Sequence, residues 1–247
     1  MPDAENESLR PLLQALARHS DPEQVKAWMK ANARRWRELM SYYHCAMMEI
    51  ETKFNVLSED LSFREDRNPI ESIRTRLKTP ESILDKLGRK CLFLSIDSIE
   101  NHIYDIAGVR VICTFESDIY RLADAFLRQD DITLIREKDY IQHPKENGYR
   151  SLHLIVAVPI FLHDEKKSIN VEVQFRTLAM DLWASTEHKI RYKQALSVDE
   201  ADTRALKDCA DLCSSLDRQL EAIYHHRLRT KASVPDGGSF HVVQKIK

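Results

Sequence analysis

The stretch Ala107-Gly-Val-Arg-Val-Ile-Cys-Thr-Phe115 decides the fold of this chain. It is mostly apolar, which predicts a buried strand. The region after it alternates between predicted helices, at 117–127 and 178–189, and predicted strands, at 132–138, 151–158 and 169–175. Because this alternation is not a strict β-α-β repeat, we expect an α+β fold in which helices cover a mixed sheet of about five strands.

Helical sequences flank this region on both sides. Asp21-Pro22-Glu23-Gln24 supplies an N-cap, a first-turn proline and a capping-box glutamine, so a long helix is predicted here, after a short helical segment at 8–19. Two apolar stripes have helical spacing: Val25, Met29, Ala33, Trp36, Leu39, Tyr43 and Met47, and then Cys209, Cys213, Leu216, Leu220 and Ile223. Such stripes usually lie in the core, but two near the ends of a chain also suit a subunit interface, so we expect a homo-oligomer.

The overall composition excludes several classes of protein. The 37 basic and 39 acidic residues give a formal net charge of −2, so any anion site must be local. Five scattered cysteines indicate a reducing compartment, and Cys209 and Cys213 lack the further ligands of a zinc site. The chain has neither the roughly 18 consecutive apolar residues of a membrane span nor the apolar segment of a signal peptide. We therefore expect a cytoplasmic protein without a structural metal.

Two acidic residues are placed beside predicted strands where they can act chemically. Strand alternation puts Glu172, Gln174 and Arg176 on one face, which is either an open functional surface or an ordinary solvated one. Asp105 precedes the buried strand, so its carboxylate either lies at the end of the strand, where ligands bind in open sheets, or forms part of a turn. Arg110 lies five residues later, an odd spacing that places it on the opposite face unless Gly108 permits a bulge.

Aromatic and basic residues gather near these acids in the sequence. Tyr149, Ser151 and His153 alternate on one side of a strand that follows the Asn147-Gly148 turn signal, and with Lys138 and Lys145 they suit either a stacked purine with phosphates or a half-buried packing role. Arg76 and Lys78 precede a helix predicted near Pro80, on which Lys86, Arg89 and Lys90 can converge on one polyanion or remain solvated.

Together, these acidic, basic and aromatic residues favour a protein that binds and transfers nucleotide phosphates. Paired acids repel phosphate unless a metal ion lies between them, which predicts a magnesium-dependent enzyme. The sequence has no Gly-x-x-x-x-Gly-Lys-Ser/Thr loop, so side-chain cations must bind the phosphates.

In their order along the chain, these motifs resemble the RelA/SpoT family, and more closely its short members, the small alarmone synthetases. The resemblance covers about 64–195. Its anchors are Arg76-Leu-Lys-Thr-Pro-Glu-Ser-Ile, Asp105-Ile-Ala-Gly-Val-Arg, Lys138-Asp-Tyr-Ile, Asn147-Gly-Tyr-Arg-Ser-Leu-His and Glu172-Val-Gln-Phe-Arg-Thr-Leu-Ala-Met. It implies a nucleotidyltransferase-like synthetase domain that transfers pyrophosphate from ATP to the ribose 3′-hydroxyl of GDP or GTP, which gives the alarmone (p)ppGpp and AMP.

The resemblance also implies roles for individual residues. Asp105 and Glu172 would hold Mg²⁺, and Glu172 would take the proton of the attacking hydroxyl. ATP would be bound by Arg76, Lys78, Lys86, Arg89 and Arg110. Tyr149 would stack on guanine, and the acceptor would be surrounded by Lys138, Lys145, His153 and Gln174.

The helical stripes, the composition of the tail and the resemblance together divide the chain into four segments. They are a helical extension at 1–60, the synthetase domain at 61–195, a helix at 196–230 and a flexible tail at 231–247. The hydrolase domain of longer relatives is marked by a His-Asp pair, which occurs here only as His163-Asp164 in a predicted loop, so we expect synthesis without hydrolysis. A homotetramer is expected, with no stable nucleic-acid partner.

Two other functions fit the same residues. One is a pyrophosphokinase with a different acceptor, such as an adenine nucleotide or the 3′ end of tRNA, because a tyrosine stacks on any purine. The other is a non-catalytic module that binds alarmone or single-stranded RNA, and the retention of both acids argues against it.

Overall fold

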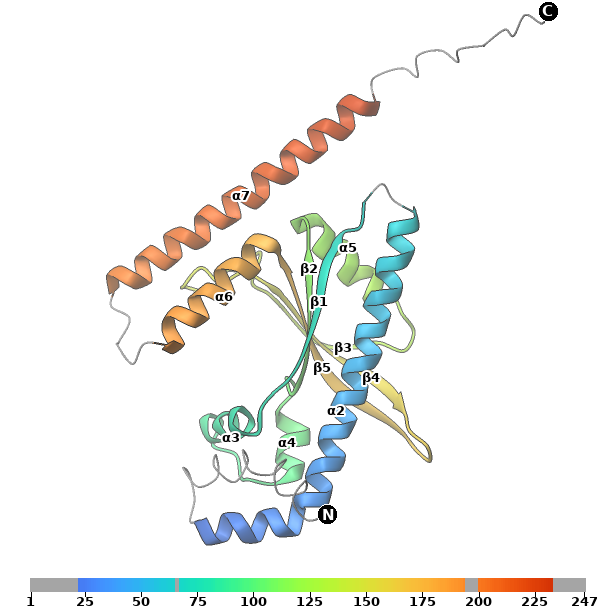
Figure 1. Cartoon of the computed structure of the whole chain (residues 1–247), viewed down its shortest axis with the longest axis vertical. Helices are drawn as coiled ribbons and strands as arrows, with labels where there is room; N and C mark the ends of the chain where they lie inside the picture. Colours follow the sequence, from blue (N-terminus) through green and yellow to red (C-terminus); the bar gives the residue numbers. More distant parts are fainter. Residues whose placement is uncertain (1–21, 65–66, 194–199, 233–247) are drawn as a thin grey trace, which may run out of the picture.

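A five-stranded mixed sheet forms the centre of the molecule in this computed structural model, which describes residues 22–64, 67–193 and 200–232 (Figure 1). The strand order is β1-β2-β5-β4-β3; β2 and β5 are parallel, and every other neighbouring pair is antiparallel. The strands are β1 (Ile70–Leu77), β2 (Ala107–Cys113), β3 (Thr133–Asp139), β4 (Leu152–Phe161) and β5 (Lys166–Thr177). The expected α+β fold with a mixed sheet is confirmed.

Strand β1 is an edge strand that the apolar pattern did not predict. Its apolar residues Ile70, Ile73 and Leu77 are spaced by three and four, which imitates a helix. The structure shows why this spacing occurs in a strand, because the pairing with β2 shifts register between Ile70 and Ser72. The irregularity interrupts the two-residue alternation on which strand prediction depends.

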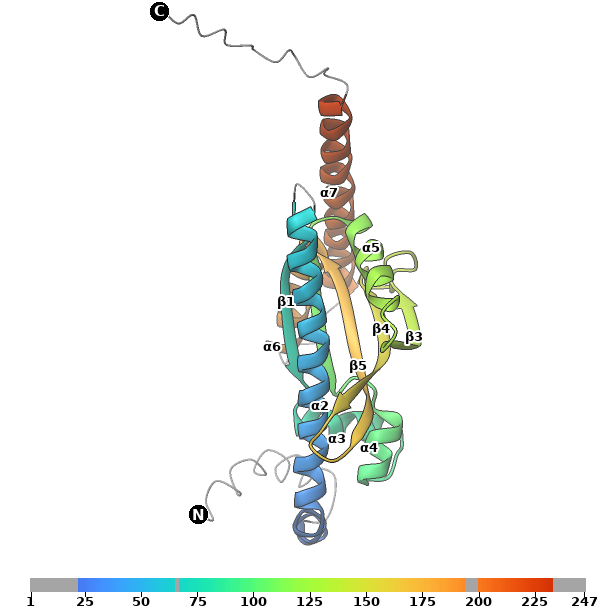
Figure 2. The same ribbon diagram turned by 90° about the vertical axis from the view of Figure 1, so that its right-hand side faces the viewer.

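One face of the sheet is covered by two helices that carry most of the core. Figures 1 and 2 show α2 (Pro22–Arg64) and α5 (Glu116–Leu127) on the same side, with α2 running along the length of the sheet. Phe54 of α2 stacks on Phe126 of α5, with ring centroids 4.7 Å apart, and contacts the ring of Phe175 on β5 edge-on. These three rings are fully buried and join both helices to the sheet.

The apolar stripe predicted early in the chain packs within this core. Its residues from Trp36 to Met47 are buried against the sheet, and the interface role considered for this stripe therefore does not apply to them. The helix expected at 8–19 and the N-cap expected at Asp21 lie outside the described residues.

Two shorter helices lie at one end of the sheet. Helix α3 (Pro80–Arg89) begins as expected, because the Thr79 hydroxyl accepts a hydrogen bond from the Ser82 backbone N–H and Pro80 occupies the first turn. Helix α4 (Ile96–His102) has only seven residues, too few for a helical period to show in the sequence. Together they place their basic residues next to the start of β2.

The last two helices lie on the other side of the sheet from α2 and α5 (Figure 1). They are α6 (Leu178–Lys193) and α7 (Glu200–Ala232), and most of the tail expected at 231–247 lies beyond the described residues. The Trp183 indole N–H of α6 donates to the Leu206 carbonyl of α7 at 2.7 Å. The ring of Tyr224 contacts that of Phe115, with centroids 4.9 Å apart, and Arg67 lies over both rings, 4.8 Å from each centroid, which fixes the far part of α7. None of the helices in the described ranges is long and apolar enough to cross a membrane.

The attachment of α7 to β5 is expected to depend on pH. The Thr177 hydroxyl donates to Asp217 of α7 at 2.6 Å. Burial raises the pKa of Asp217 to about 6; the Thr177 hydrogen bond opposes this rise, and the charges of Glu116 and Glu221 add to it. Because the folded chain holds this proton more tightly than the unfolded chain does, the group stabilises the fold at low pH, and this contribution is lost as the pH rises through about 6.

Replacing Asp217 by asparagine should therefore raise the melting temperature at pH 7.5 and raise it by clearly less at pH 5, which lies between the unfolded and folded pKa values. The amide keeps an acceptor for Thr177 and removes the buried charge, so the gain at pH 7.5 should be about 1–3 kcal/mol. Calorimetric scans of both proteins at the two pH values measure this difference. An equal shift at both pH values would contradict the assignment.

Candidate functional site

Two rows of mostly polar residues cross the face of the sheet opposite α2 and α5, and strand register sets both. In the first row, the cross-strand partners are Arg74, Arg110, Gln174, His153 and Lys138, one from each strand. In the second row, the partners are Arg76, Gly108, Glu172, Ile155 and Arg136. The face that carries Glu172 is therefore largely polar, with one carboxylate among five arginine and lysine side chains.

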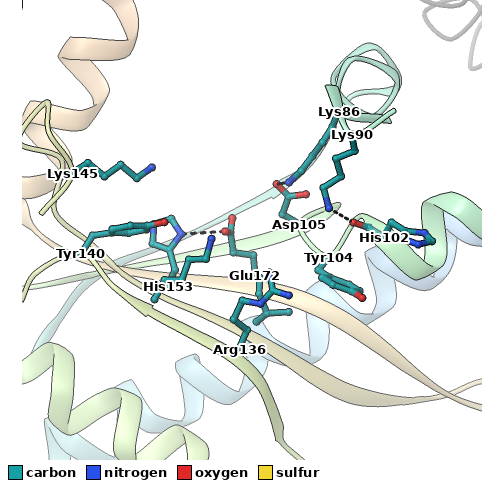
Figure 3. Close-up of a pocket in the computed structure, with 12 residues that line it drawn as sticks. Lys86, Lys90, His102, Tyr104, Asp105, Arg136, Tyr140, Lys145, His153 and Glu172 are labelled. Carbon is teal, nitrogen blue, oxygen red and sulfur yellow. Dashed lines mark hydrogen bonds and ion pairs between the residues drawn. The ribbon is translucent and has the colours of Figure 1, made fainter. Parts of the chain in front are cut away.

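Two cavities lie on this face and share Asp105 and Glu172 as a common wall. The β1-side cavity has a volume of about 420 Å³ and is lined by the basic residues Arg74, Arg76, Lys78 and Arg110, with Thr75, Gly108, Val109 and Gln174. The β3-side cavity has a volume of about 230 Å³ and is lined by Lys86, Lys90, His102, Tyr104, Arg136, Lys138, Tyr140, Lys145, His153 and Ile155 (Figure 3). Each cavity is thus cationic, and the two meet at a pair of acids.

Asp105 lies in the turn before β2, where two lysines bind one of its oxygens. Lys86 Nζ is 2.6 Å and Lys78 Nζ is 3.1 Å from Oδ2. Burial raises the pKa of this carboxyl, but the Lys86 hydrogen bond and the two lysine charges outweigh burial and leave the pKa below its usual value. The other oxygen, Oδ1, is buried and has no hydrogen-bond partner among the described residues. A buried carboxylate oxygen without a donor is suited to a cation.

The odd spacing between Asp105 and Arg110 needs no bulge. Asp105 precedes the first residue of β2, Ala107, so it is outside the pleat, and the register of Gly108 and its neighbours is regular. Arg110 points to the same face as Glu172 and lines the β1-side cavity with Asp105. The two residues therefore meet in one site although strict alternation from Asp105 would separate them.

Glu172 projects from the middle of β5, and each of its oxygens accepts one hydrogen bond. His153 Nδ1 is 3.2 Å from Oε1, and Gln174 Nε2 donates to Oε2 at 2.8 Å. Burial raises the pKa of Glu172, but the hydrogen bonds from His153 and Gln174 and the His153 charge leave it below its usual value. The charge of Asp105 acts in the opposite sense, so the two carboxylates are close enough to repel each other.

Tyr149 is held beside the β3-side cavity by a chain of hydrogen bonds. Arg176 Nη2 donates to its hydroxyl at 2.8 Å, and the hydroxyl lies 2.8 Å from His153 Nε2. The ring is half-buried against α6 and α7, and it is Tyr140 that lines the cavity. Lys145 Nζ lies 4.6 Å from the centroid of Tyr140 and 4.8 Å from that of Tyr149. The sequence analysis missed Tyr140, whose only signal is its place in the Lys138-Asp-Tyr-Ile motif.

The loop that carries Tyr149 packs directly on α7. Gly148 has a φ of +86°, and a Cβ atom there would lie 2.5 Å from the Cβ of Ala210. Only glycine fits this position, because both the backbone conformation and the contact exclude a side chain. The Asn147-Gly148 turn signal in the sequence thus corresponds to a close approach between the loop and α7.

Most of the other residues expected in the site line one of the two cavities. Arg76, Lys78 and Arg110 line the β1-side cavity, and so does Gln174, which was expected near the acceptor; Lys86, Lys138, Lys145 and His153 line the β3-side cavity. Arg89 is exposed at the end of α3 and lines neither cavity, whereas its neighbour Lys90 does and donates to the His102 carbonyl. The residues that sequence reasoning missed are Arg74, Arg136, Tyr104, His102 and Tyr140.

The residues present fit a metal ion only if other groups complete its ligand set. Within the described ranges, no group of three or more His, Cys, Asp or Glu side chains could hold a metal. Asp105 and Glu172 supply two carboxylates, and Mg²⁺ is commonly bound by one or two carboxylates together with substrate phosphates and water. The unpartnered Oδ1 of Asp105 is consistent with such an arrangement.

Comparison with known proteins identifies the family. The model described as "Region found in RelA / SpoT proteins" matches residues 75–197. The chain is 42% identical to GTP pyrophosphokinase YwaC of Bacillus subtilis (strain 168) over 188 residues, which cover 76% of this chain and 90% of that protein.

Solved structures agree with this match. The crystal structure of small alarmone synthetase 1 of Bacillus subtilis bound to its product pppGpp has a TM-score of 0.72 and 33% identity, and the match covers 78% of this chain and 98% of that one. The structure of the same synthetase bound to AMPCPP has a TM-score of 0.66 and 29% identity, and the match covers 78% of this chain and 99% of that one. The shared sheet, the matched region that holds Asp105 and Glu172, and these identities together place this chain in the RelA/SpoT family, among the relatives of the small alarmone synthetases.

Proposed function

We propose that this protein is a (p)ppGpp synthetase, a GTP pyrophosphokinase that transfers pyrophosphate from ATP to the 3′-hydroxyl of GDP or GTP and releases AMP. The observation that carries this proposal is the pair of cationic cavities that meet at Asp105 and Glu172. Transfer between two nucleotides requires two anion sites that face one reacting centre, and the common acidic wall provides that centre.

ATP binds in the β1-side cavity in this proposal. This cavity is the larger one, and three arginines and a lysine line it, which suits a triphosphate. Lys86, at the common wall, contacts Asp105 from the β3 side and is placed to bind the phosphates that are transferred. A relative of this chain binds AMPCPP, an analogue of ATP.

GDP or GTP binds in the β3-side cavity. Lys138, Lys145 and His153 supply donors for its phosphates, and Tyr149, with Tyr140 beside it, supplies an aromatic surface for guanine. A relative that is one third identical in sequence was crystallised with pppGpp. The acceptor ribose then lies against Glu172, which forms the wall between the two cavities.

Glu172 is the proton acceptor in the transfer. The 3′ oxygen of the acceptor bonds to the β-phosphorus of ATP, the bond from that phosphorus to the α,β-bridging oxygen breaks, and AMP leaves with that oxygen. Because its pKa is held below the usual value, Glu172 is ionised at neutral pH and can take the hydroxyl proton. His153 and Gln174 hold its two oxygens in place while it does so.

Mg²⁺ is the cofactor that the two acids would bind, and when bound it neutralises the phosphate oxygens on which charge develops. Asp105 Oδ1 and Glu172 are the protein ligands in this proposal, and Lys78 and Lys86 keep Asp105 oriented through Oδ2.

The activity is synthesis without hydrolysis. His163 and Asp164 lie in the turn between β4 and β5, and neither cavity includes them. The described residues form one synthetase sheet with its helices and show no hydrolase domain.

One assay tests the proposed function. The protein is incubated with Mg²⁺ and ATP labelled in its β-phosphate, together with GDP, GTP, unlabelled adenine nucleotides or tRNA, and the products are separated by anion-exchange chromatography. Label on GDP or GTP, with release of AMP, is the expected result. Label only on adenine nucleotides or tRNA would show a different acceptor, and binding of nucleotides without any transfer would indicate a non-catalytic module.

Replacing Tyr149 by alanine should weaken the acceptor more than ATP. Loss of a stacked aromatic ring is expected to raise the KM for GDP or GTP about tenfold and to change the KM for ATP less than twofold. The matched control is Tyr149→Phe, which keeps the ring and removes the hydrogen bonds to Arg176 and His153. Equal losses for both nucleotides in Tyr149→Ala would argue against stacking.

The protein is further proposed to act as a cytoplasmic homotetramer. The second apolar stripe, on α7, supports the assembly of several subunits, because its residues Leu216, Leu220 and Ile223 remain at least 49% exposed within one chain. All five cysteines are free, which suits a reducing compartment. Light scattering after size-exclusion chromatography gives the subunit number.

A further inference from the structure

Asp181 joins three arginines from three different strands. It lies in the first turn of α6 and is 7% exposed. Its Oδ2 accepts a hydrogen bond from Arg74 Nη1 at 3.0 Å, and its Oδ1 accepts from Arg110 Nη1 at 3.2 Å and from Arg176 Nη1 at 2.9 Å. Among the residues that the structure describes, Asp181 is the only acid paired with any of these guanidinium groups. One carboxylate therefore connects β1, β2 and β5.

These arginines need an anchor because they repel one another. Arg74 and Arg110 are direct cross-strand partners in an antiparallel pair, a position in which like charges are destabilising. Burial lowers the pKa of Arg110, the charges of Arg176 and Arg74 lower it further, and the charge of Asp181 opposes these effects. Three guanidinium groups around one carboxylate leave a cationic cluster, so Asp181 holds the arginines together without neutralising them.

Two of the three arginines face the larger cavity, and Asp181 does not. Arg74 and Arg110 line the β1-side cavity, whereas Arg176 and Asp181 do not line it. Arg74 has a side chain that is 61% exposed, and its ion pair with Asp181 is what holds its guanidinium at the cavity. A free arginine side chain would lose considerable entropy on binding a phosphate, and a side chain that is already held loses less.

We propose that Asp181 is a positioning residue for the donor nucleotide, which orients Arg74 and Arg110 toward the phosphate groups in the β1-side cavity. This proposal rests on the proposed function only in placing ATP in that cavity. It assigns Asp181 no contact with substrate, since its effect passes through the two arginines. The acceptor side should depend on it less, because neither Arg74 nor Arg110 lines the β3-side cavity and Asp181 reaches Tyr149 only through Arg176.

A purely structural role for Asp181 predicts different behaviour. If Asp181 serves only to tie α6 to β5 through the buried Arg176, its loss should lower stability and affect both nucleotides alike. If Asp181 acts only as a counter-charge, its removal should strengthen ATP binding, because the three arginines then carry more net positive charge. Positioning predicts weaker ATP binding in spite of that added positive charge.

Asp181→Asn, which keeps the shape of the side chain, separates these alternatives. Isothermal titration of the whole protein with AMPCPP and, separately, with GDP measures both affinities without requiring turnover. We expect about tenfold weaker AMPCPP binding, since the amide N–H cannot accept the hydrogen bond from Arg74 and the carboxylate charge that holds Arg110 is removed, and a clearly smaller change in GDP affinity. Asp60→Asn is the matched control, because it removes an arginine-paired aspartate on α2, and neither Asp60 nor Arg64 lines a cavity.

A double-mutant cycle tests whether the effect passes through the arginines. If Asp181 acts through Arg74, Asp181→Asn should cost little further AMPCPP affinity once Arg74→Gln is present. Additive losses, or AMPCPP binding by Asp181→Asn that is unchanged or tighter, would overturn the proposal. Should Asp181→Asn fail to fold, Asp181→Glu keeps the charge but shifts it by one methylene, and AMPCPP affinity equal to that of the unaltered protein would again refute positioning.

The binding experiments on Asp181→Asn and the transfer assay of the proposed function can fail independently of each other. An unaltered protein that transfers no pyrophosphate to GDP or GTP refutes the function, whatever Asp181→Asn does. An active unaltered protein whose Asp181→Asn variant binds AMPCPP normally refutes only the positioning role.

Discussion

Replacing Glu172 by glutamine is expected to lower the rate of pyrophosphate transfer by about 10³-fold. The amide has nearly the shape of the carboxylate but cannot take a proton from the acceptor hydroxyl. It also presents an N–H group toward one of the two donors, His153 or Gln174, that now bind carboxylate oxygens. The effect should appear in kcat, measured by release of AMP with both nucleotides at saturation, because Glu172 is proposed to act in the transition state.

The control for this variant is Glu137→Gln on the edge strand β3. Glu137 is exposed, pairs across the sheet with Leu154 and belongs to neither cavity. It should have unchanged activity. Turnover within about tenfold of normal in Glu172→Gln, with an intact fold by circular dichroism, would show that another group takes the proton.

Asp105→Asn is expected to lower turnover by at least about 10²-fold and to raise the Mg²⁺ concentration needed for half-maximal rate. Asparagine offers one neutral oxygen where the carboxylate offers two charged ones, so it is a weaker ligand for a hard cation. It also weakens the ion pairs that orient Lys78 and Lys86. Rates measured across a Mg²⁺ titration, at fixed concentrations of ATP and GDP, distinguish weaker metal binding from a changed orientation of the two lysines.

The Mg²⁺ titration of Asp105→Asn decides whether Asp105 binds the metal. A reduced rate with an unchanged Mg²⁺ dependence would mean that Asp105 serves to orient the lysines and that the metal is bound elsewhere. Asp130→Asn, an exposed aspartate in the loop between α5 and β3, should match the unaltered protein at every Mg²⁺ concentration.

Local patterns were sufficient to predict four of the five strands that make the site, β1 being the exception. The alternation of Val171, Val173 and Phe175 with Glu172 and Gln174 predicted which side of β5 is buried, and the structure confirms it. The Thr79-Pro80 start of α3 was equally predictable, because a cap and a first-turn proline are local signals.

The two rows across the sheet could not be predicted in this way. Whether Arg110 lies opposite Gln174 depends on the register of strands that are 64 residues apart in sequence, and no local signal encodes that register. The same limit applies to Asp181, because its place in the first turn of α6 gives no sign of its arginine partners. Its role became visible only when three strands brought their arginines to it.

Tyr149 shows a different limit of sequence reasoning. The alternation of Tyr149, Ser151 and His153 predicted a ring and an imidazole on one side, and their hydroxyl and Nε2 are indeed 2.8 Å apart. The contact of this loop with α7 could not be foreseen, since Ala210 lies about 60 residues further along the chain. The ring packs against residues of α6 and α7, and Tyr140, which is beside it, lines the cavity instead.

The contact between Gly148 and Ala210 has a practical consequence for protein engineering. Helix α7 supplies no side chain to either cavity, so a minimal version of the enzyme designed from the pocket residues alone would omit it. The loop that carries Gly148 and Tyr149 would then lose its support, because it packs on a surface of α7 formed by Ala210, Leu206 and Cys213. A shortened catalyst, or a chimera that combines this sheet with another scaffold, must therefore retain the first half of α7.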